Sequence, residues 1–155
     1  MITIAKLFTD GASRGNPGPA AVAYRIIGAD GALLEARVER IPNATNNEAE
    51  YAALTTGLKA CRRLGIQAVR AVSDSELMVR QIRGRYRAKE PRLAALRDAA
   101  REFIARDFLD VAREHRHRTD PDIAECDRMA DELLTADGFP KGPPDYRRFR
   151  RRRRT

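Results

Sequence analysis

The sequence predicts an α/β domain with a five-stranded mixed sheet and helices on both of its faces. Three strand-like segments follow one another near the N-terminus, and the remaining chain then alternates helix, strand, helix, helix, strand and helix. The first pattern is typical of hairpins, and the second is typical of strands covered by helices. Together they predict one mixed sheet rather than a bundle or a sandwich.

Each predicted element has a local signal. Ala29-Asp30-Gly31 is typical of a tight hairpin turn, and the first helix is expected to begin at a Thr or Asn cap and to end at Gly65. We predict strands over residues 2–9, 20–28, 31–39, 67–73 and 108–115, and helices over residues 45–65, 75–84, 91–106 and 122–136.

The net charge of +8 is unevenly distributed along the 155 residues. The segment from Lys141 onward contains one Lys, seven Arg and one Asp, so residues 1–140 carry a net charge of only +1. We therefore divide the chain into a folded domain over residues 1–137 and a Gly/Pro-rich linker with an arginine-rich tail over residues 138–155. Such a tail is expected to be solvated and to attract the phosphates of RNA or DNA in a salt-sensitive way.

The composition also excludes several classes of protein. The N-terminal apolar run is short and contains Thr3 and Lys6, and no apolar segment is long enough to cross a membrane. Cys61 and Cys126 lack the spacing of a zinc site and are expected to be buried thiols. We therefore expect a soluble, cytoplasmic protein without a membrane partner. The sequence carries no signal of oligomeric state, and a monomer is the default expectation.

The segment T-D-G-A-S-R-G-N-P-G-P-A, residues 9–20, places an acid before a run rich in glycine and proline. One interpretation is a turn between two strands. The other is a site at which a carboxylate stands at a strand end and the loop backbone approaches a ligand. Asp10 alternates with Phe8 and Ile4, so it is expected on their face of the first strand, at the C-terminal end of that strand.

Helical geometry separates two acids of the first helix. At 100° per residue, Glu50 lies within about 40° of Leu54 and Cys61 on the apolar face, whereas Glu48 lies on the opposite side with Lys59. A carboxylate on a buried face costs several kcal/mol unless it is paired, protonated or facing a metal ion. Glu50 therefore requires a partner, and Glu48 does not.

Three further residues have both a structural and a functional interpretation. Asp74 follows the fourth strand and could cap the next helix, which Ser73 and Glu76 could also do as a capping box. Asp127 lies at the edge of the apolar face of the last helix, where it could reach a cleft or face solvent. His117 lies in a polar loop and could simply be exposed.

Taken together, these segments resemble the ribonuclease H type 1 family, which also occurs as a domain of reverse transcriptases. T-D-G-A-S-R-G-N-P-G-P-A is similar to the first family motif, T-N-N-E-A-E-Y-A-A-L to the second, S-D-S-E-L to the third and C-D-R-M-A-D-E to the last. The similarity extends over about residues 3–136. The resemblance implies the ribonuclease H fold and a metal-dependent endonuclease that hydrolyses the RNA strand of RNA/DNA hybrids to 5′-phosphate and 3′-hydroxyl ends.

The resemblance also implies roles for individual residues. Two Mg²⁺ ions, or Mn²⁺ as a possible substitute, would stabilise the reacting phosphate, and a histidine ten residues before Asp127 would move a proton or help to release the product. That histidine is His117, with His115 nearby. The implied metal ligands are Asp10, Glu50, Asp74 and Asp127, and the implied contacts to the hybrid are Gly11, Asn16, Asn46, Asn47 and Ser75.

The sequence departs from the family pattern at several positions. Glu76 stands where several relatives have an amide, and Ile123 stands where a polar residue is expected. The long basic handle of some relatives is absent, and either the segment R-G-R-Y-R-A-K or the arginine-rich tail could replace it. Two other functions stay open: a non-catalytic module that binds hybrids or duplex RNA, and a nuclease of the same fold that cuts DNA junctions.

Overall fold

The computed structural model describes residues 2–84 and 90–142 of the chain. The strands are β1 (Ile4–Ser13), β2 (Gly18–Gly28), β3 (Leu33–Ala44), β4 (Ala68–Ser73) and β5 (Asp110–His115). The helices are α1 (Asn46–Arg63), α2 (Glu76–Ile82), α3 (Pro91–Asp107) and α4 (Pro121–Ala136). All nine predicted elements are therefore present in the predicted order.

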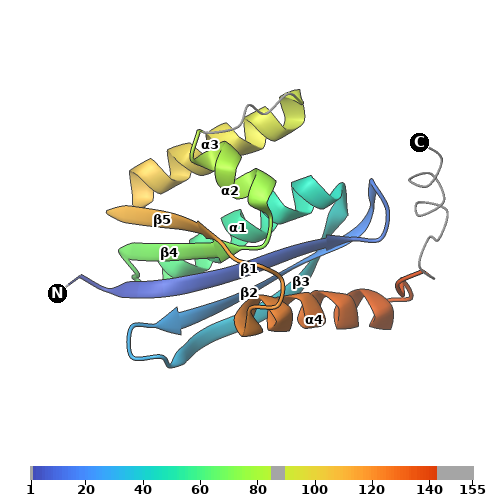
Figure 1. Ribbon diagram of the computed structural model, residues 1–155, viewed down its shortest axis with the longest axis horizontal. Coiled ribbons are helices and arrows are strands. Elements are labelled where there is room, and N and C mark those ends of the chain that lie inside the picture. Colours follow the sequence, from blue (N-terminus) through green and yellow to red (C-terminus); the bar gives the residue numbers. More distant parts are fainter. Residues whose placement is uncertain (1, 85–89, 143–155) are drawn as a thin grey trace, which may run out of the picture.

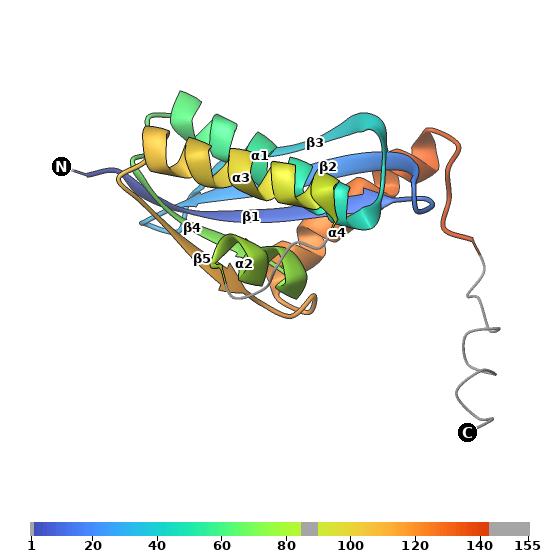
Figure 2. The same ribbon diagram turned by 90° about the horizontal axis from the view of Figure 1, so that it is seen from above.

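The strands form one mixed sheet in the order β3-β2-β1-β4-β5. The first three strands pair antiparallel, whereas β4 pairs parallel to both β1 and β5. Helices α1, α2 and α3 lie on one side of the sheet and α4 lies on the other (Figure 1). The view from above places α3 alongside α1 (Figure 2). The predicted mixed sheet with helices on both faces is thus confirmed.

Two apolar layers hold the helices to the sheet. Leu7, Leu58 and Phe103 belong to the layer between the sheet and the α1–α3 side. Phe8 and Ile123 belong to the layer beneath α4, and the side chain of Ile123 is fully buried. This burial gives a structural reason for an apolar residue at position 123. Both cysteines are buried free thiols, as predicted.

The first strand is longer than predicted. It continues through Asp10 to Ser13, because β2 keeps pairing with it as far as Ser13 opposite Ala20. The prediction that Asp10 stands at the C-terminal end of the strand is therefore wrong, and Asp10 lies within β1. Because side chains alternate along a strand, Asp10 lies on the same face of β1 as Phe8, as predicted.

Capping residues fix the starts of two helices. The Thr45 side chain accepts a hydrogen bond from the Glu48 amide, and the Glu48 side chain accepts one from the Thr45 amide, which completes a capping box at α1. At α2 the cap is Ser75, whose hydroxyl accepts from the Met78 amide. The alternative capping roles considered for Asp74 and for Ser73 with Glu76 are therefore wrong.

Helix α1 approaches β1 closely at Gly11. A Cβ atom at this position would lie 2.2 Å from the Ala49 carbonyl oxygen and 2.6 Å from the Glu50 nitrogen. Both neighbours are backbone atoms, so they cannot give way by changing a rotamer. The glycine is thus required by the packing of the helix against the strand.

No helix within the described ranges combines the length and the apolar character needed to cross a bilayer.

We expect Gly11→Ala to lower the free energy of unfolding by about 3 kcal/mol, because the added methyl group must push α1 away from β1. Urea unfolding followed by circular dichroism measures this change. Gly142→Ala is a matched control, since a Cβ there meets nothing within 4 Å, and it should change stability by less than about 0.5 kcal/mol. Equal stabilities of the two variants would contradict the assigned contact.

Candidate active site

The sheet opens beside Asp10. β1 pairs with β4 only as far as Phe8, opposite Val72, although it continues to pair with β2 up to Ser13. From Asp10 onward, the edge of β1 that faces β4 therefore has no strand partner among residues 2–84 and 90–142. Asp10 itself is only 5% exposed.

Glu50 enters this opening from α1. Its Oε1 accepts a hydrogen bond from the Gly11 amide at 3.3 Å, and its Oε2 accepts one from the Ser73 hydroxyl at 3.4 Å. The side chain is thus tied to both β1 and the end of β4. Glu50 is buried, whereas Glu48 caps the helix, so the distinction drawn from helical geometry is confirmed.

Asp74 completes a compact group of carboxylates. It follows the last residue of β4, and one carboxylate oxygen each from Asp10, Glu50 and Asp74 lie within 4.8 Å of one another. Asp127 approaches from α4, on the opposite side of the sheet, and its charge acts on both Asp10 and Asp74. Asp127 is exposed, in keeping with its position at the edge of the apolar face of α4. The fold thus brings the four predicted acids together from four separate elements or their ends.

This crowding raises the pKa of the central acids. Burial raises the pKa of Asp10 to about 8, and the charges of Asp74 and Asp127 act in the same direction. The pKa of Glu50 is raised well above its ordinary value by burial and by its acidic neighbours Asp10 and Asp74. Burial also raises the pKa of Asp74. A bound cation would remove this repulsion and favour the ionised carboxylates.

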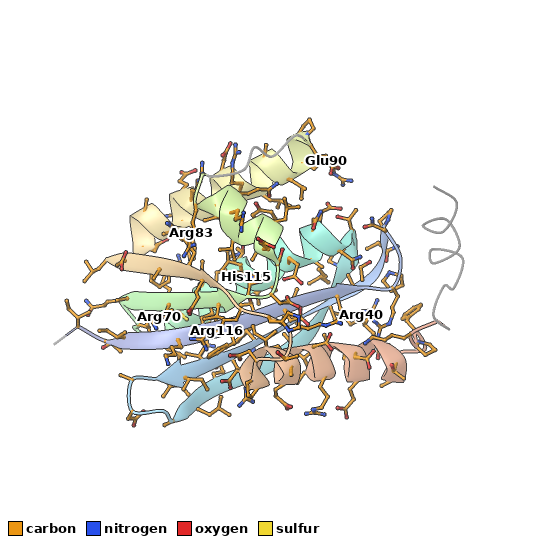
Figure 3. The ribbon with its side chains drawn as sticks, in the orientation of Figure 1. Arg40, Arg70, Arg83, Glu90, His115 and Arg116 are labelled. Atoms are coloured by element: carbon orange, nitrogen blue, oxygen red, sulfur yellow. The ribbon has the colours of Figure 1, made fainter. Side chains whose placement is uncertain are left out.

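The structure places the two histidines differently. His117 is exposed, and its Nδ1 lies 3.0 Å from the Thr119 hydroxyl and accepts from the Thr119 amide at 3.3 Å. His115, which is labelled in Figure 3, is the last residue of β5. The parallel register of β4 and β5 places it opposite Ser73. Burial dominates the raised pKa of Asp74, but the charges of His115 and Arg118 oppose that rise. His115 is therefore the histidine linked to the carboxylate group by electrostatics.

Ser73 and Arg118 were not among the predicted site residues. The sequence suggests only a capping role for Ser73, yet its hydroxyl donates to the Glu50 carboxylate and also accepts from the Ser75 amide at 3.0 Å. Its alternation with the buried residues Val69 and Ala71 shows that it faces the α1 side of the sheet. The sequence contains that alternation, but the approach of Glu50 to Ser73 depends on the tertiary packing of α1.

The predicted substrate-binding residues fall into two groups. Asn16 and Asn46 are joined, because the Asn46 amide donates to the Asn16 Oδ1 at 3.1 Å. Asn47 is exposed in the first turn of α1. The Gly11 amide and the Ser75 hydroxyl both have protein partners, so their contacts to a substrate strand stay predictions.

Comparisons with known proteins agree with this geometry. The model of the family described as "Reverse transcriptase-like" matches residues 8–133. The chain is 38% identical over 127 residues to the curated protein Ribonuclease HI of Halobacterium salinarum, a match that covers 82% of this chain and 62% of the relative. The crystal structure of RNase H1 from the same archaeon has 35% identity and a TM-score of 0.82, covering 86% of this chain and 98% of that one.

The chain belongs to the ribonuclease H type 1 family. A second member with a solved structure is LC11-RNase H1 in complex with RNA/DNA hybrid, at 31% identity and a TM-score of 0.80, covering 86% of this chain and 98% of that one. The resemblance inferred from the four motifs is thus confirmed, together with its fold. Membership also supports a metal-dependent site built on the carboxylate group of Asp10, Glu50 and Asp74.

We expect Asp10→Asn to stabilise the metal-free protein by at least about 1 kcal/mol at pH 8. The folded state holds a proton on Asp10 up to pH about 8, whereas the unfolded state loses it near 3.8. The folded state thus binds more protons between these values, and the free energy of unfolding of the wild type falls as the pH rises through this window. The variant lacks this contribution.

Urea unfolding in EDTA between pH 4 and pH 8 measures the effect. Asp98→Asn is the control, because Asp98 is an exposed acid of α3 that does not belong to the carboxylate group. Parallel pH profiles for wild type and Asp10→Asn would contradict the raised pKa of Asp10.

Proposed function

We propose that this chain is an endoribonuclease that hydrolyses the RNA strand of RNA/DNA hybrids, leaving 5′-phosphate and 3′-hydroxyl ends. The observation that carries the proposal is the compact group of carboxylates from β1, α1 and the end of β4, in which Asp10 and Glu50 are buried, with Asp127 beside it. The name of the Halobacterium relative and the hybrid bound to LC11-RNase H1 support the same activity and substrate. Because the chain spans only 62% of the Halobacterium relative, this activity is carried over as a proposal.

The ligand set fits a hard divalent cation. Asp10, Glu50 and Asp74 offer only carboxylate oxygens, the donors that Mg²⁺ and Mn²⁺ prefer. Burial and the neighbouring acidic charges raise the pKa of Asp10 and of Glu50, and a bound cation would offset that repulsion. We propose that Asp10, Glu50, Asp74 and Asp127 hold two Mg²⁺ ions during catalysis, with Mn²⁺ as a possible substitute. When bound, these ions would activate water and neutralise charge on the phosphate.

The protein groups would position this chemistry. Ser73 and the Gly11 amide hold both oxygens of Glu50, so that carboxylate keeps its orientation before any ligand binds. Asp10 is fixed by its burial within β1. His117 is proposed to move a proton or to help release the product, and His115 is the alternative because of its position opposite Ser73.

The hybrid is proposed to lie across the carboxylates and the start of α1. Asn16, Asn46 and Asn47 would contact the strands there, together with the Gly11 backbone and Ser75. Discrimination of RNA from DNA requires a hydrogen bond to the 2′-hydroxyl and recognition of the duplex shape.

The two other functions fit less well. A module that only binds nucleic acid would gain nothing from clustered carboxylates facing phosphates, since the binding term comes from positive charge. A junction nuclease is less favoured, because the N-P-G and T-N-N segments resemble the hybrid-cleaving branch of the fold and because one solved relative, LC11-RNase H1, holds a hybrid. We therefore favour hybrid cleavage.

The remaining proposals concern the whole chain. We propose a cytoplasmic monomer with a catalytic domain over residues 1–137. The arginine-rich tail and residues 85–89 of the segment R-G-R-Y-R-A-K lie outside the described residues, and we propose that the tail adds salt-sensitive attraction to phosphates.

Cleavage of a labelled RNA/DNA hybrid with Mg²⁺ tests the function, with the same RNA single-stranded or in an RNA duplex as comparison substrates. Asp10→Asn should lower hybrid cleavage by about a thousandfold or more, because it removes a central carboxylate ligand of the metal ions whose charge would stabilise the transition state. Asp98→Asn, which removes an exposed charge on α3, should keep full activity. Binding of the hybrid without cleavage in Mg²⁺ or Mn²⁺ would instead establish the non-catalytic module, and cleavage of DNA junctions alone would establish the junction nuclease.

A further inference from the structure

The chain does not leave the domain freely after α4. Gly138, with a φ of +93°, reverses the backbone, its amide donates to the Thr135 carbonyl at 3.1 Å, and the Phe139 amide donates to the Leu134 carbonyl at 2.8 Å. This pair of hydrogen bonds is a Schellman motif, which fixes the direction of the chain at the end of a helix. We call residues 137–142, which follow the helix, the strap.

Two arginines, one from the turn between β1 and β2 and one from β3, hold the strap. The Arg14 Nε donates to the Phe139 carbonyl at 2.8 Å, and its guanidinium also pairs with Asp131 of α4. The Arg40 Nη1 pairs with Asp137 at 3.0 Å, and its guanidinium carbon lies 5.1 Å from the centre of the Phe139 ring. Only 12% of the Arg14 side chain is exposed, so this arginine is built into the contact rather than free in solvent.

The strap lies at the end of the molecule where the hybrid is proposed to bind. Arg14 belongs to the turn between β1 and β2, and Asn16 of the same turn accepts from the Asn46 amide at the start of α1. Ser13 is three strand residues beyond Asp10, about 10 Å along β1. Figures 1 and 2 both show the segment after α4 beside the β1–β2 turn, whereas the N-terminus lies at the opposite end of β1.

We propose that the strap fixes the point at which the arginine-rich tail leaves the domain. The tail would then contact phosphates of the same hybrid that occupies the active site. The first tail arginine, Arg147, is five residues beyond Gly142, and the last, Arg154, is twelve beyond it. Fully extended, these segments span at most about 17 Å and about 40 Å, so the arginines can reach about one helical turn of duplex beside the site.

Charge and packing both favour this partner. The tail carries seven arginines, whereas the domain before Lys141 is nearly neutral, so the tail is the main source of phosphate attraction in the chain. Holding one end of a charged segment near its target raises the effective concentration of the segment there. The inference rests on the proposed hybrid substrate, but it does not depend on cleavage.

A double-mutant comparison tests whether the strap acts on hybrid binding through the tail or only by stabilising the domain. Hybrid affinity is measured by fluorescence anisotropy in EDTA at low salt, so that binding is read without strand cutting. Four chains are compared: the full chain, the chain lacking residues 146–155, and each of these with the strap double variant Arg40→Gln/Phe139→Ala. As a control, the full chain and the shortened chain are each also made with Arg70→Gln/Leu109→Ala. This double variant likewise removes one charge and one exposed apolar side chain, but these residues lie on β4 and just before β5. Arg40 and Arg70 are separated along the sheet in Figure 3.

We expect removal of residues 146–155 to weaken hybrid binding by about tenfold or more. The slope of the logarithm of the binding constant against the logarithm of the salt concentration should also become shallower, by about 0.9 for each phosphate that the tail neutralises in the full chain. The strap double variant should weaken binding by about threefold or more in the full chain and leave the shortened chain unchanged. The control double variant should show no such dependence on the tail.

Equal effects of the strap variant in both backgrounds would overturn the proposal, because the strap would then act only on the domain. Unchanged binding after removal of residues 146–155 would overturn it as well. Neither result would bear on hybrid cleavage by the full chain, whose absence would instead overturn the proposed function.

Discussion

The approach of α1 to β1 at Gly11 is the contact on which the site depends. Because position 11 has no Cβ, the backbone of Ala49 and Glu50 can pack directly on the strand. The Glu50 carboxylate then reaches the opening where β4 ends, and it accepts from the Gly11 amide and the Ser73 hydroxyl. A side chain at position 11 would displace the helix and separate Glu50 from Asp10. Gly11, which the sequence alone suggests could belong to a turn, is therefore required for the packing that brings the carboxylates together.

The same contact imposes an electrostatic constraint. Burial of Asp10 and Glu50 next to Asp74 raises the pKa of each group, so the metal-free site cannot ionise fully at neutral pH. The domain gives up stability to keep acids in this arrangement, which is the behaviour expected of a functional site. Asp127, on the exposed edge of α4, approaches the group from the other side of the sheet, and its charge acts on both Asp10 and Asp74.

The sequence was informative wherever periodicity decides the position of a side chain. The 100° spacing of α1 separated the buried Glu50 from the capping Glu48, and the apolar face of α4 placed Asp127 at its edge. Local rules were less reliable where several residues could play one role: Ser75, rather than Ser73 or Asp74, caps α2. The length of β1 could not be predicted from its own glycines, because its pairing with β2 extends the strand to Ser13. The place of His115 opposite Ser73 depends on the parallel register of β4 and β5, two strands far apart in the chain.

The central claim is that these carboxylates form a site for a divalent cation, and proton release on metal binding tests it most directly. Calorimetric titration of the protein with Mg²⁺ at pH 7, in two buffers with different ionisation enthalpies, measures both binding and the number of protons released. Since the pKa of Asp10 is about 8 without metal, binding should release close to one proton or more, and Asp10→Asn should reduce this number. Binding without proton release, or equal release by wild type and Asp10→Asn, would contradict the account.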